Sequence, residues 1–147
     1  MPDSPDLCGV WRLQAFYLEV AETGRRLEPF GPAPKGALIM HPDGRMMALI
    51  TPGEQKLLTT DAEQADAFRK LVAYSGLYRL EPPDRFVTSV DVAWFQPWLG
   101  TDQARTFSLD GDTLHIMSAP TRSPMTGDAL AVGVLSWARE TRSAGRA

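Results

Sequence analysis

The residues best suited to chemistry in this sequence gather in one stretch, 94–107, which reads WFQPWLGTDQARTF. Two tryptophans, Trp94 and Trp98, flank a Gln-Pro pair, and Arg105 opens a new alternation of apolar and polar residues. Aromatic walls with a few placed polar groups are typical of small-molecule sites. The stretch therefore indicates a site for a small amphipathic or aromatic molecule, with Arg105 as its polar anchor.

The strands around this stretch decide where Arg105 points. Strands over residues 85–95 and 104–110 are predicted to pair antiparallel, with Phe95 opposite Ala104. One face would then carry three pairs, in which every residue except Arg105 is apolar: Trp94 with Arg105, Val92 with Phe107, and Val90 with Leu109. We expect this face to line an interior.

An inward Arg105 needs a partner, because an isolated buried cation is costly. Stacking on an indole ring gains about 0.5–2 kcal/mol, too little alone to offset full burial. The candidate partners are an internal carboxylate, backbone carbonyls with water, or the anionic head group of a ligand. The alternative is an Arg105 that extends to the rim, with its stem along Trp94.

Other aromatic and sulfur-containing residues are candidate wall residues, each with a structural alternative. Trp98 would be a rim aromatic or part of the loop packing. For Tyr74 and Tyr78 we favour core packing, with each hydroxyl hydrogen-bonded, over ligand contact. Met46 would fill the core or line an adaptable pocket. The candidate ligand-binding residues are Trp94, Arg105, Phe107, Val92, Trp98, Met46, Tyr78 and Tyr74.

Most of the chain alternates with a period of two, which predicts strands. Residues 9–20 place Trp11, Leu13, Ala15 and Tyr17 on one face, and residues 36–51 form two runs about Pro42-Asp43-Gly44, a hairpin signal. A helical pattern covers only residues 61–75, with Ala65, Phe68, Leu71 and Val72 on one face. Thr60 and Glu63 have capping-box spacing, Asp66 and Lys70 form an i,i+4 pair, and Gly76 would end the helix.

These segments predict about eight strands with one helix inserted after the third. Short connections imply antiparallel neighbours, and eight up-and-down strands can close into a barrel that holds one small ligand. The competing architecture is an open curved sheet wrapped on the helix. Length predicts one domain over residues 1–140, followed by a flexible tail over 141–147.

Composition narrows the function classes. The net charge is −3 with no clustered basic face, so no nucleic-acid partner is expected. No apolar run reaches a membrane span, and the N-terminus lacks the features of a signal peptide, so we expect a cytoplasmic protein. The single cysteine, Cys8, forms no internal disulfide and is expected to be a small buried side chain. Self-association into a homodimer is left open.

Motifs for catalysis and cofactor binding are missing from the sequence. The two histidines, His41 and His115, face away from their apolar neighbours and make no persuasive metal site. We therefore assign no catalytic residue, metal or cofactor. An enzyme of the isomerase or cyclase type stays an alternative if Asp91, Asp102 or Glu54 turns inward as a base near Arg105. A partner-binding module with a filled barrel is another, using residues 120–128 and 30–35.

Several stretches resemble a known family. GVWRL (9–13) resembles the Gly-x-Trp opening of lipocalins, and the chain is similar to a bacterial and fungal lipocalin-like domain family through PFG (29–31), GALIMHPDG (36–44), AYSGLYRL (73–80), PWLGTDQARTF (97–107) and LDGDTLHI (109–116). The resemblance implies a lipocalin-like barrel of the calycin type. It also implies that Arg139 packs across Trp11 to close the floor, with Gly9 and Gly44 as structural positions.

The chain also departs from that family. Members often carry a histidine pair where this sequence has Thr88 and Ser89, so no role of those histidines is carried over. Fold does not fix activity, and the resemblance implies a barrel rather than a reaction. The function predicted from the sequence is therefore binding of a small hydrophobic or amphipathic ligand inside the barrel.

Overall fold

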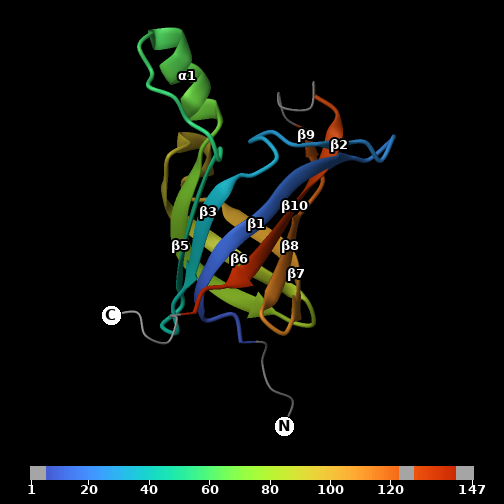
Figure 1. Cartoon of the computed structure of the whole chain (residues 1–147). Coiled ribbons are helices and arrows are strands. Elements are labelled where there is room, and N and C mark those ends of the chain that lie inside the picture. The colour runs from blue at the N-terminus through green and yellow to red at the C-terminus, as the bar shows by residue number, and fades with distance from the viewer. Residues whose placement is uncertain (1–5, 123–127, 142–147) are drawn as a thin grey trace.

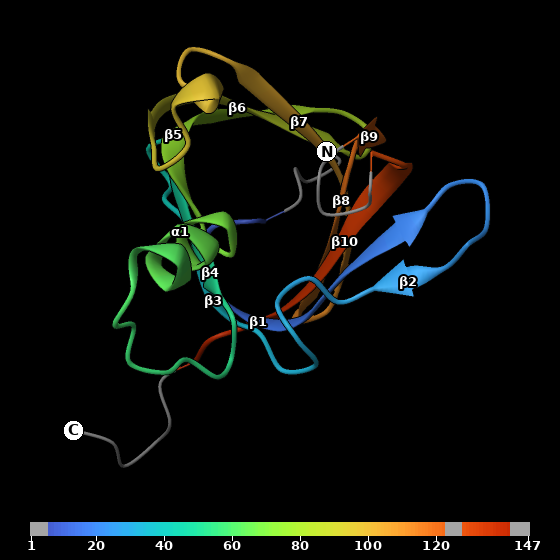
Figure 2. The same cartoon turned by 90° about the horizontal axis from the view of Figure 1, so that it is seen from above.

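The computed structural model describes residues 6–122 and 128–141, and it forms a closed antiparallel barrel (Figures 1 and 2). Strands β1, β3, β4, β5, β6, β7, β8 and β10 follow one another around the ring, and β1 pairs with β10 to close it. The elements in chain order are β1 (Gly9–Val20), β2 (Arg26–Leu27), β3 (Lys35–Met40), β4 (Arg45–Thr51), α1 (Asp61–Arg69), β5 (Val72–Glu81), β6 (Arg85–Ala93), the 3-10 turn η1 (Gln96–Trp98), β7 (Asp102–Asp110), β8 (Thr113–Ser118), β9 (Thr121–Arg122) and β10 (Leu130–Arg139).

The predicted eight-stranded up-and-down barrel with one inserted helix is confirmed. Two short strands, β2 and β9, are additions that extend the sheet beyond β1 and β10. Part of the predicted 120–128 loop is strand β9, and residues 123–127 lie outside the described residues, as does most of the predicted tail, 142–147. No helix within the described ranges is long and apolar enough to cross a membrane.

The hairpin predicted at Pro42-Asp43-Gly44 is present between β3 and β4. The backbone N–H of His41 donates to the Arg45 carbonyl at 2.8 Å, and Gly44 has a φ of +101°. This φ is a left-handed value that favours glycine. The turn fixes the β3–β4 register, in which Met40 lies opposite Met46.

The facing predicted for β1 was only half right. Trp11 and Leu13 point inward and are buried, but the register shifts between Leu13 and Ala15. After this bulge the inward residues are Phe16, Leu18 and Val20, while Ala15 and Tyr17 are only partly buried. A bulge inserts one unpaired residue, so a strict period of two cannot follow the strand through it.

Helix α1 is shorter than predicted and ends at Arg69. Val72 and Tyr74 instead pair with Ile50 and Ala48 of β4, so strand pairing overrides the helical period, and Gly76 lies within β5. None of the nine residues of α1, all of which the structure describes, is buried. The helix therefore projects beyond the barrel end instead of packing on it, as Figure 1 shows.

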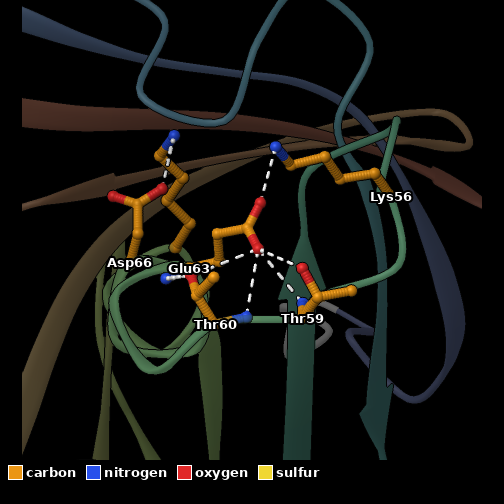
Figure 3. A network of polar contacts seen from close by, with 6 residues as sticks. Lys56, Thr59, Thr60, Glu63 and Asp66 are labelled. Atoms are coloured by element: carbon orange, nitrogen blue, oxygen red, sulfur yellow. Dashed lines mark hydrogen bonds and ion pairs between the residues drawn. The ribbon is translucent and has the colours of Figure 1, made fainter.

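The start of α1 is held by its own polar network (Figure 3). The predicted capping box is confirmed, because the Glu63 N–H donates to Thr60 Oγ1 at 3.1 Å and the Thr60 N–H donates to Glu63 Oε1 at 3.2 Å. Lys56 Nζ lies 2.8 Å from Glu63 Oε2, and the predicted Asp66–Lys70 pair is 3.2 Å apart. This network stabilises the helix without help from the barrel.

The two ends of the barrel are built from different segments. We call the end with the N-terminal segment and the β3–β4, β5–β6 and β7–β8 turns the floor, and the end with α1, η1 and the β1–β2 turn the mouth (Figure 1). Buried side chains of one hydrophobic cluster fill the interior from the floor upward, including Trp11, Phe86, Leu114 and Trp137.

Candidate functional site

Arg105 lies on the inner face of β7, in a register different from the predicted one. It pairs with Phe86 on β6 and with Ser118 on β8, not with Trp94. The register was wrong because residues 94–101 fold into their own turns. There the Gly100 N–H donates to the Val90 carbonyl at 3.0 Å and the Val90 N–H donates to the Thr101 carbonyl at 2.9 Å. The inner-face assignment of Arg105 survives, since Phe86 and Phe107 beside it are both buried.

The tryptophan beside Arg105 is Trp98, which η1 brings over the mouth. The guanidinium carbon of Arg105 lies 5.9 Å from the Trp98 ring centroid. Arg105 Nη1 donates to the Ala104 carbonyl at 3.0 Å and more weakly to Gln103 Oε1 at 3.4 Å. Among the described residues, no carboxylate lies within 4.0 Å of this half-buried cation. Arg105 thus has an aromatic neighbour and two neutral acceptors, but no counter-ion among residues 6–122 and 128–141.

Three aromatic rings form one side of the mouth. Trp98 meets Tyr74 edge-on with 5.0 Å between ring centroids, and it meets Trp94 at 5.2 Å. Trp94 Nε1 donates to the Phe68 carbonyl at 3.3 Å, which ties this cluster to α1. Tyr74 is buried, while Trp94 and Trp98 are partly exposed. The cluster gives Arg105 an apolar wall that is partly exposed to solvent.

A buried hydroxyl lies next to Arg105 on the inner wall. Thr88 is 1 % exposed, and its Oγ1 finds no hydrogen-bond partner within the described ranges. Thr88 pairs with Gln103 while Phe86 pairs with Arg105, so Thr88 and Arg105 are diagonal neighbours. Sequence reasoning missed Thr88 and Gln103 as site residues, although alternation from Arg105 places Gln103 on the same face.

The wall above Arg105 is lined by small residues. Ser118 lies opposite Arg105 on β8, and its Oγ accepts from the Gly133 N–H at 2.9 Å. A methyl group added at Gly133 would lie 3.3 Å from Ser118 Oγ and 3.7 Å from Leu18. An added side chain at Gly133 would therefore be in close contact with its neighbours, so glycine lets β10 pack tightly against Ser118 and Leu18.

The remaining candidate residues do not join this cluster. The inner position predicted for Val92 was wrong, because a bulge between Ser75 and Gly76 turns Val92 outward, where it is 60 % exposed. Phe107 and Met46 are buried in the core cluster.

Tyr78 lies toward the floor. Its hydroxyl donates to the His41 carbonyl at 3.4 Å and lies 3.6 Å from Cys8 Sγ. Burial and then this Cys8 contact raise the pKa of Tyr78 to about 12, so the phenol stays neutral.

The floor holds the second arginine that faces a tryptophan. Arg139 lies 4.3 Å over the Trp11 ring, which is the contact that the lipocalin resemblance implies. Its Nη1 donates to the Cys8 carbonyl at 2.8 Å, its Nη2 donates to the Asp6 carbonyl at 3.1 Å, and its Nε lies 3.3 Å from Asp112 Oδ1. Trp11 Nε1 donates to the Leu7 carbonyl at 3.0 Å. Every nitrogen of this guanidinium has a partner.

A cavity of about 1040 Å³ lies between α1, residues 51–58 and the loop 29–33, on the α1 side of the mouth. Its charged walls include Lys56, Glu63, Asp66 and Lys70, which already pair with one another in Figure 3. Arg105 and Trp98 do not line it. These four charged side chains of the cavity are thus paired, whereas Nε and Nη2 of Arg105 have no acceptor among the described residues. No sequence pattern indicated the cavity, because it depends on α1 standing clear of the barrel.

The carboxylates considered as bases lie outside the barrel interior. Asp91 binds Arg45 on the outer wall at 2.7 Å, and Asp102 accepts from Ser89 Oγ at 2.8 Å and lies 3.5 Å from Arg79. Glu54 lines the cavity beside α1. The enzyme alternative needed one of them beside Arg105, and none occupies that position. Within the described ranges, no group of three His, Cys, Asp or Glu residues could hold a metal ion.

A closed eight-stranded antiparallel barrel with one inserted helix, and with Arg139 stacked on Trp11 at its floor, defines a lipocalin-like domain. The model of the lipocalin-like domain family matches residues 8–140, and the chain therefore belongs to this family. No curated protein matches the chain.

Proposed function

We propose that the chain binds a small amphipathic molecule in the half of the barrel next to the mouth. The molecule would have an aromatic or apolar body and a negatively charged head. The observation that carries the proposal is Arg105. It is an inward, half-buried guanidinium with no carboxylate within 4.0 Å in the described part of the chain. The family supports ligand binding in general, and the positive charge of Arg105 indicates that the ligand is negatively charged.

The free donors of Arg105 favour an oxyanion. Its hydrogen bonds within the described ranges come from Nη1, which leaves Nε and Nη2 without protein acceptors. A guanidinium presents its donors as a planar fork that matches carboxylate and sulfonate groups with two parallel hydrogen bonds. The Trp98 ring, near the 6 Å limit of a cation–π contact, contributes too little to replace that partner.

The surroundings of Arg105 suit the body of such a ligand. Tyr74 and Trp98 offer aromatic surface on one side, and Ser118 lies opposite Arg105 on the other. The Thr88 hydroxyl is buried and has no partner among the described residues. It would form one hydrogen bond with a polar atom of the ligand that lies deeper than the head group. An unpaired buried polar group costs about 1–3 kcal/mol, so its satisfaction on binding is favourable.

The test uses 1-anilinonaphthalene-8-sulfonate, an aromatic anion, and N-phenyl-1-naphthylamine, a similar aromatic probe without the sulfonate. Arg105→Leu should weaken binding of the sulfonate by about 10- to 100-fold, the equivalent of one lost charged hydrogen-bonding group. Binding of the uncharged probe should change by less than about threefold, because its recognition depends on apolar contact. Both affinities are measured by fluorescence titration.

Two variants control for the position of the probe. Arg12→Leu removes the same charge from the outer face, where Arg12 pairs loosely with Glu140 at 3.8 Å, and should leave both affinities unchanged. Leu58→Ser alters the cavity beside α1 and should also have no effect. The proposal is wrong if Arg105→Leu leaves sulfonate binding unchanged, or if Arg12→Leu or Leu58→Ser weakens it as much.

A further inference from the structure

One outer wall of the barrel carries exposed apolar side chains. Ile39, Met47, Leu49, Leu77 and Val92 are each between 43 % and 60 % exposed, and we call these five residues the apolar wall. They come from β3, β4, β5 and β6, which are neighbours in the sheet. The other large exposed apolar residues in the described ranges lie at the mouth or the segment before α1, apart from Met117 on β8.

Strand register makes the apolar wall continuous. Ile39 lies opposite Met47, Met47 opposite Ser75, and Ser75 opposite Val92, so these residues form one row across four strands. Leu49 and Leu77 lie two positions along their strands from this row and thus share its outward face. Directly opposite residues are about 4.5–5.5 Å apart at Cβ, which is side-chain contact distance.

The size of the wall fits a protein interface. Five large side chains, each about half exposed, present several hundred Å² of apolar surface, the upper range for a monomer. A stable dimer buries about 800 Å² on each partner, with an apolar centre and a polar rim. The apolar wall supplies the apolar contact, and the Arg45–Asp91 ion pair, held over the buried Ser75 within the row, supplies a polar contact inside it.

The charges at the wall are already paired and lie on different strands. Arg45 Nη2 lies 2.7 Å from Asp91 Oδ2, Arg45 Nη1 lies 3.0 Å from Asp91 Oδ1, and Arg45 Nη1 also donates to Ser75 Oγ at 2.9 Å. The wall is therefore neutral and selects neither an acidic nor a basic partner. A two-fold axis through the wall would place the cation on β4 of one copy near the anion on β6 of the other, which is self-complementary.

We propose that the apolar wall is the interface of a homodimer, and that its occupant is the same wall of a second copy of this chain. The arrangement leaves the mouth of each barrel free, so it is independent of ligand binding. It also explains why the outer faces of β3–β6 are rich in large apolar residues while α1, at the mouth, contributes none to the wall.

The test is the mass in solution, measured by sedimentation velocity from about 1 µM to 100 µM, the range of ordinary dimer affinities. The wild-type chain should reach twice its 16.2 kDa mass. Met47→Lys and Leu77→Lys should shift the dimer dissociation constant upward by at least about tenfold, because each places two like charges in a desolvated interface. Met47→Leu should keep the dimer.

Met117→Lys is the matched control, since Met117 is 43 % exposed on the outer face of β8, away from the wall. It should stay dimeric, and circular dichroism should report the same fold for all variants. A wild-type chain that is monomeric throughout the range overturns the proposal, as does equal dissociation by Met117→Lys. A monomer that binds phosphatidylcholine vesicles only while Met47 is present also overturns it and assigns the wall to a membrane surface.

Discussion

At the floor of the barrel Arg139 lies 4.3 Å from the Trp11 ring, and at the mouth Arg105 lies 5.9 Å from the Trp98 ring. Within the described residues, the floor arginine uses all three of its nitrogens on protein acceptors, whereas the mouth arginine uses only Nη1. The same two residue types thus have different environments. The floor arginine is held by the fold through each nitrogen, and the mouth arginine keeps two nitrogens for the ligand that we propose.

The largest difference between the two ends should appear when the tryptophans are removed. Trp11→Ala should destabilise the chain by about 3–5 kcal/mol, because Trp11 is fully buried and its removal leaves a cavity. Trp98→Ala should cost less than about 1.5 kcal/mol, because Trp98 is only partly buried. Urea unfolding measures both values. Equal losses would mean that the mouth is as much a part of the core as the floor.

Replacing the floor arginine should also destabilise the chain more than replacing the mouth arginine, with a smaller difference than for the tryptophans. Arg139→Leu should cost about 3 kcal/mol, because it leaves the Cys8 carbonyl without its donor and breaks the pair with Asp112. Arg105→Leu should change the free energy of unfolding by less than about 0.5 kcal/mol, since it removes a half-buried cation without a counter-ion. A large loss in Arg105→Leu would assign Arg105 to the fold.

Glycines near each arginine give a smaller test. Gly9 has a φ of +132°, and an added Cβ would lie 3.0 Å from Arg139 Nη1, so Gly9→Ala should cost about 2 kcal/mol. At Gly133 an added Cβ would make a tight 3.3 Å contact with Ser118 Oγ, but no left-handed φ adds strain there, so Gly133→Ala should cost less than about 1 kcal/mol. Thermal unfolding of the two variants compares them directly. A reversed order would show that the space beside Arg105 is more tightly packed than the floor.

The smallest expected effects come from pH and act at opposite ends of the scale. Lys56 first, and then the Thr59 amide, lower the pKa of Glu63 to about 2, below its ordinary value of 4.5. The cap therefore stabilises α1 fully above pH 4.5 and loses this effect as the pH falls toward 2. The raised pKa of Tyr78 acts in the other sense, so its contribution is full below pH 10 and is lost as the pH rises through about 12.

NMR separates these two titrations. The Glu63 side-chain carboxyl shift should titrate near pH 2, and the α1 amide shifts should follow it while the barrel amides do not. Tyrosinate absorbance should lose its most alkaline step in Tyr78→Phe. A Glu63 titration near 4.5 would contradict the network in Figure 3.

The fold was largely predictable because its signals are local. Alternation located the strands, Pro42-Asp43-Gly44 located a turn, and Thr60 with Glu63 located the helix start. The errors in facing follow from bulges, which reverse the facing of every later residue, as in β1 after Leu13 and in β6 at Val92. The overlong helix and the wrong β6–β7 register follow from backbone pairing, of Val72 with β4 and of residues 100–101 with Val90. A bulge depends on how two strands fit each other, so neither strand's sequence reveals it.

The candidate site was predictable in part. The inward side of Arg105 follows from alternation within β7, but its neighbour does not. Trp98 reaches it only because residues 94–101 fold back on Val90, and Thr88 joins it only through the resulting register. Both depend on long-range backbone pairing. The predicted role of Arg105 as a ligand anchor stays a prediction until the probes are tested.

The self-contained cap of α1 has a consequence for how this chain tolerates change. Because α1, in the segment between β4 and β5, buries none of its residues, the core of the barrel contains no α1 side chain. Segments with exposed backbone and few buried contacts are where inserted domains and new chain termini are accepted. We therefore expect this segment to be where relatives differ most in length, and where a reporter protein could be inserted without loss of the barrel.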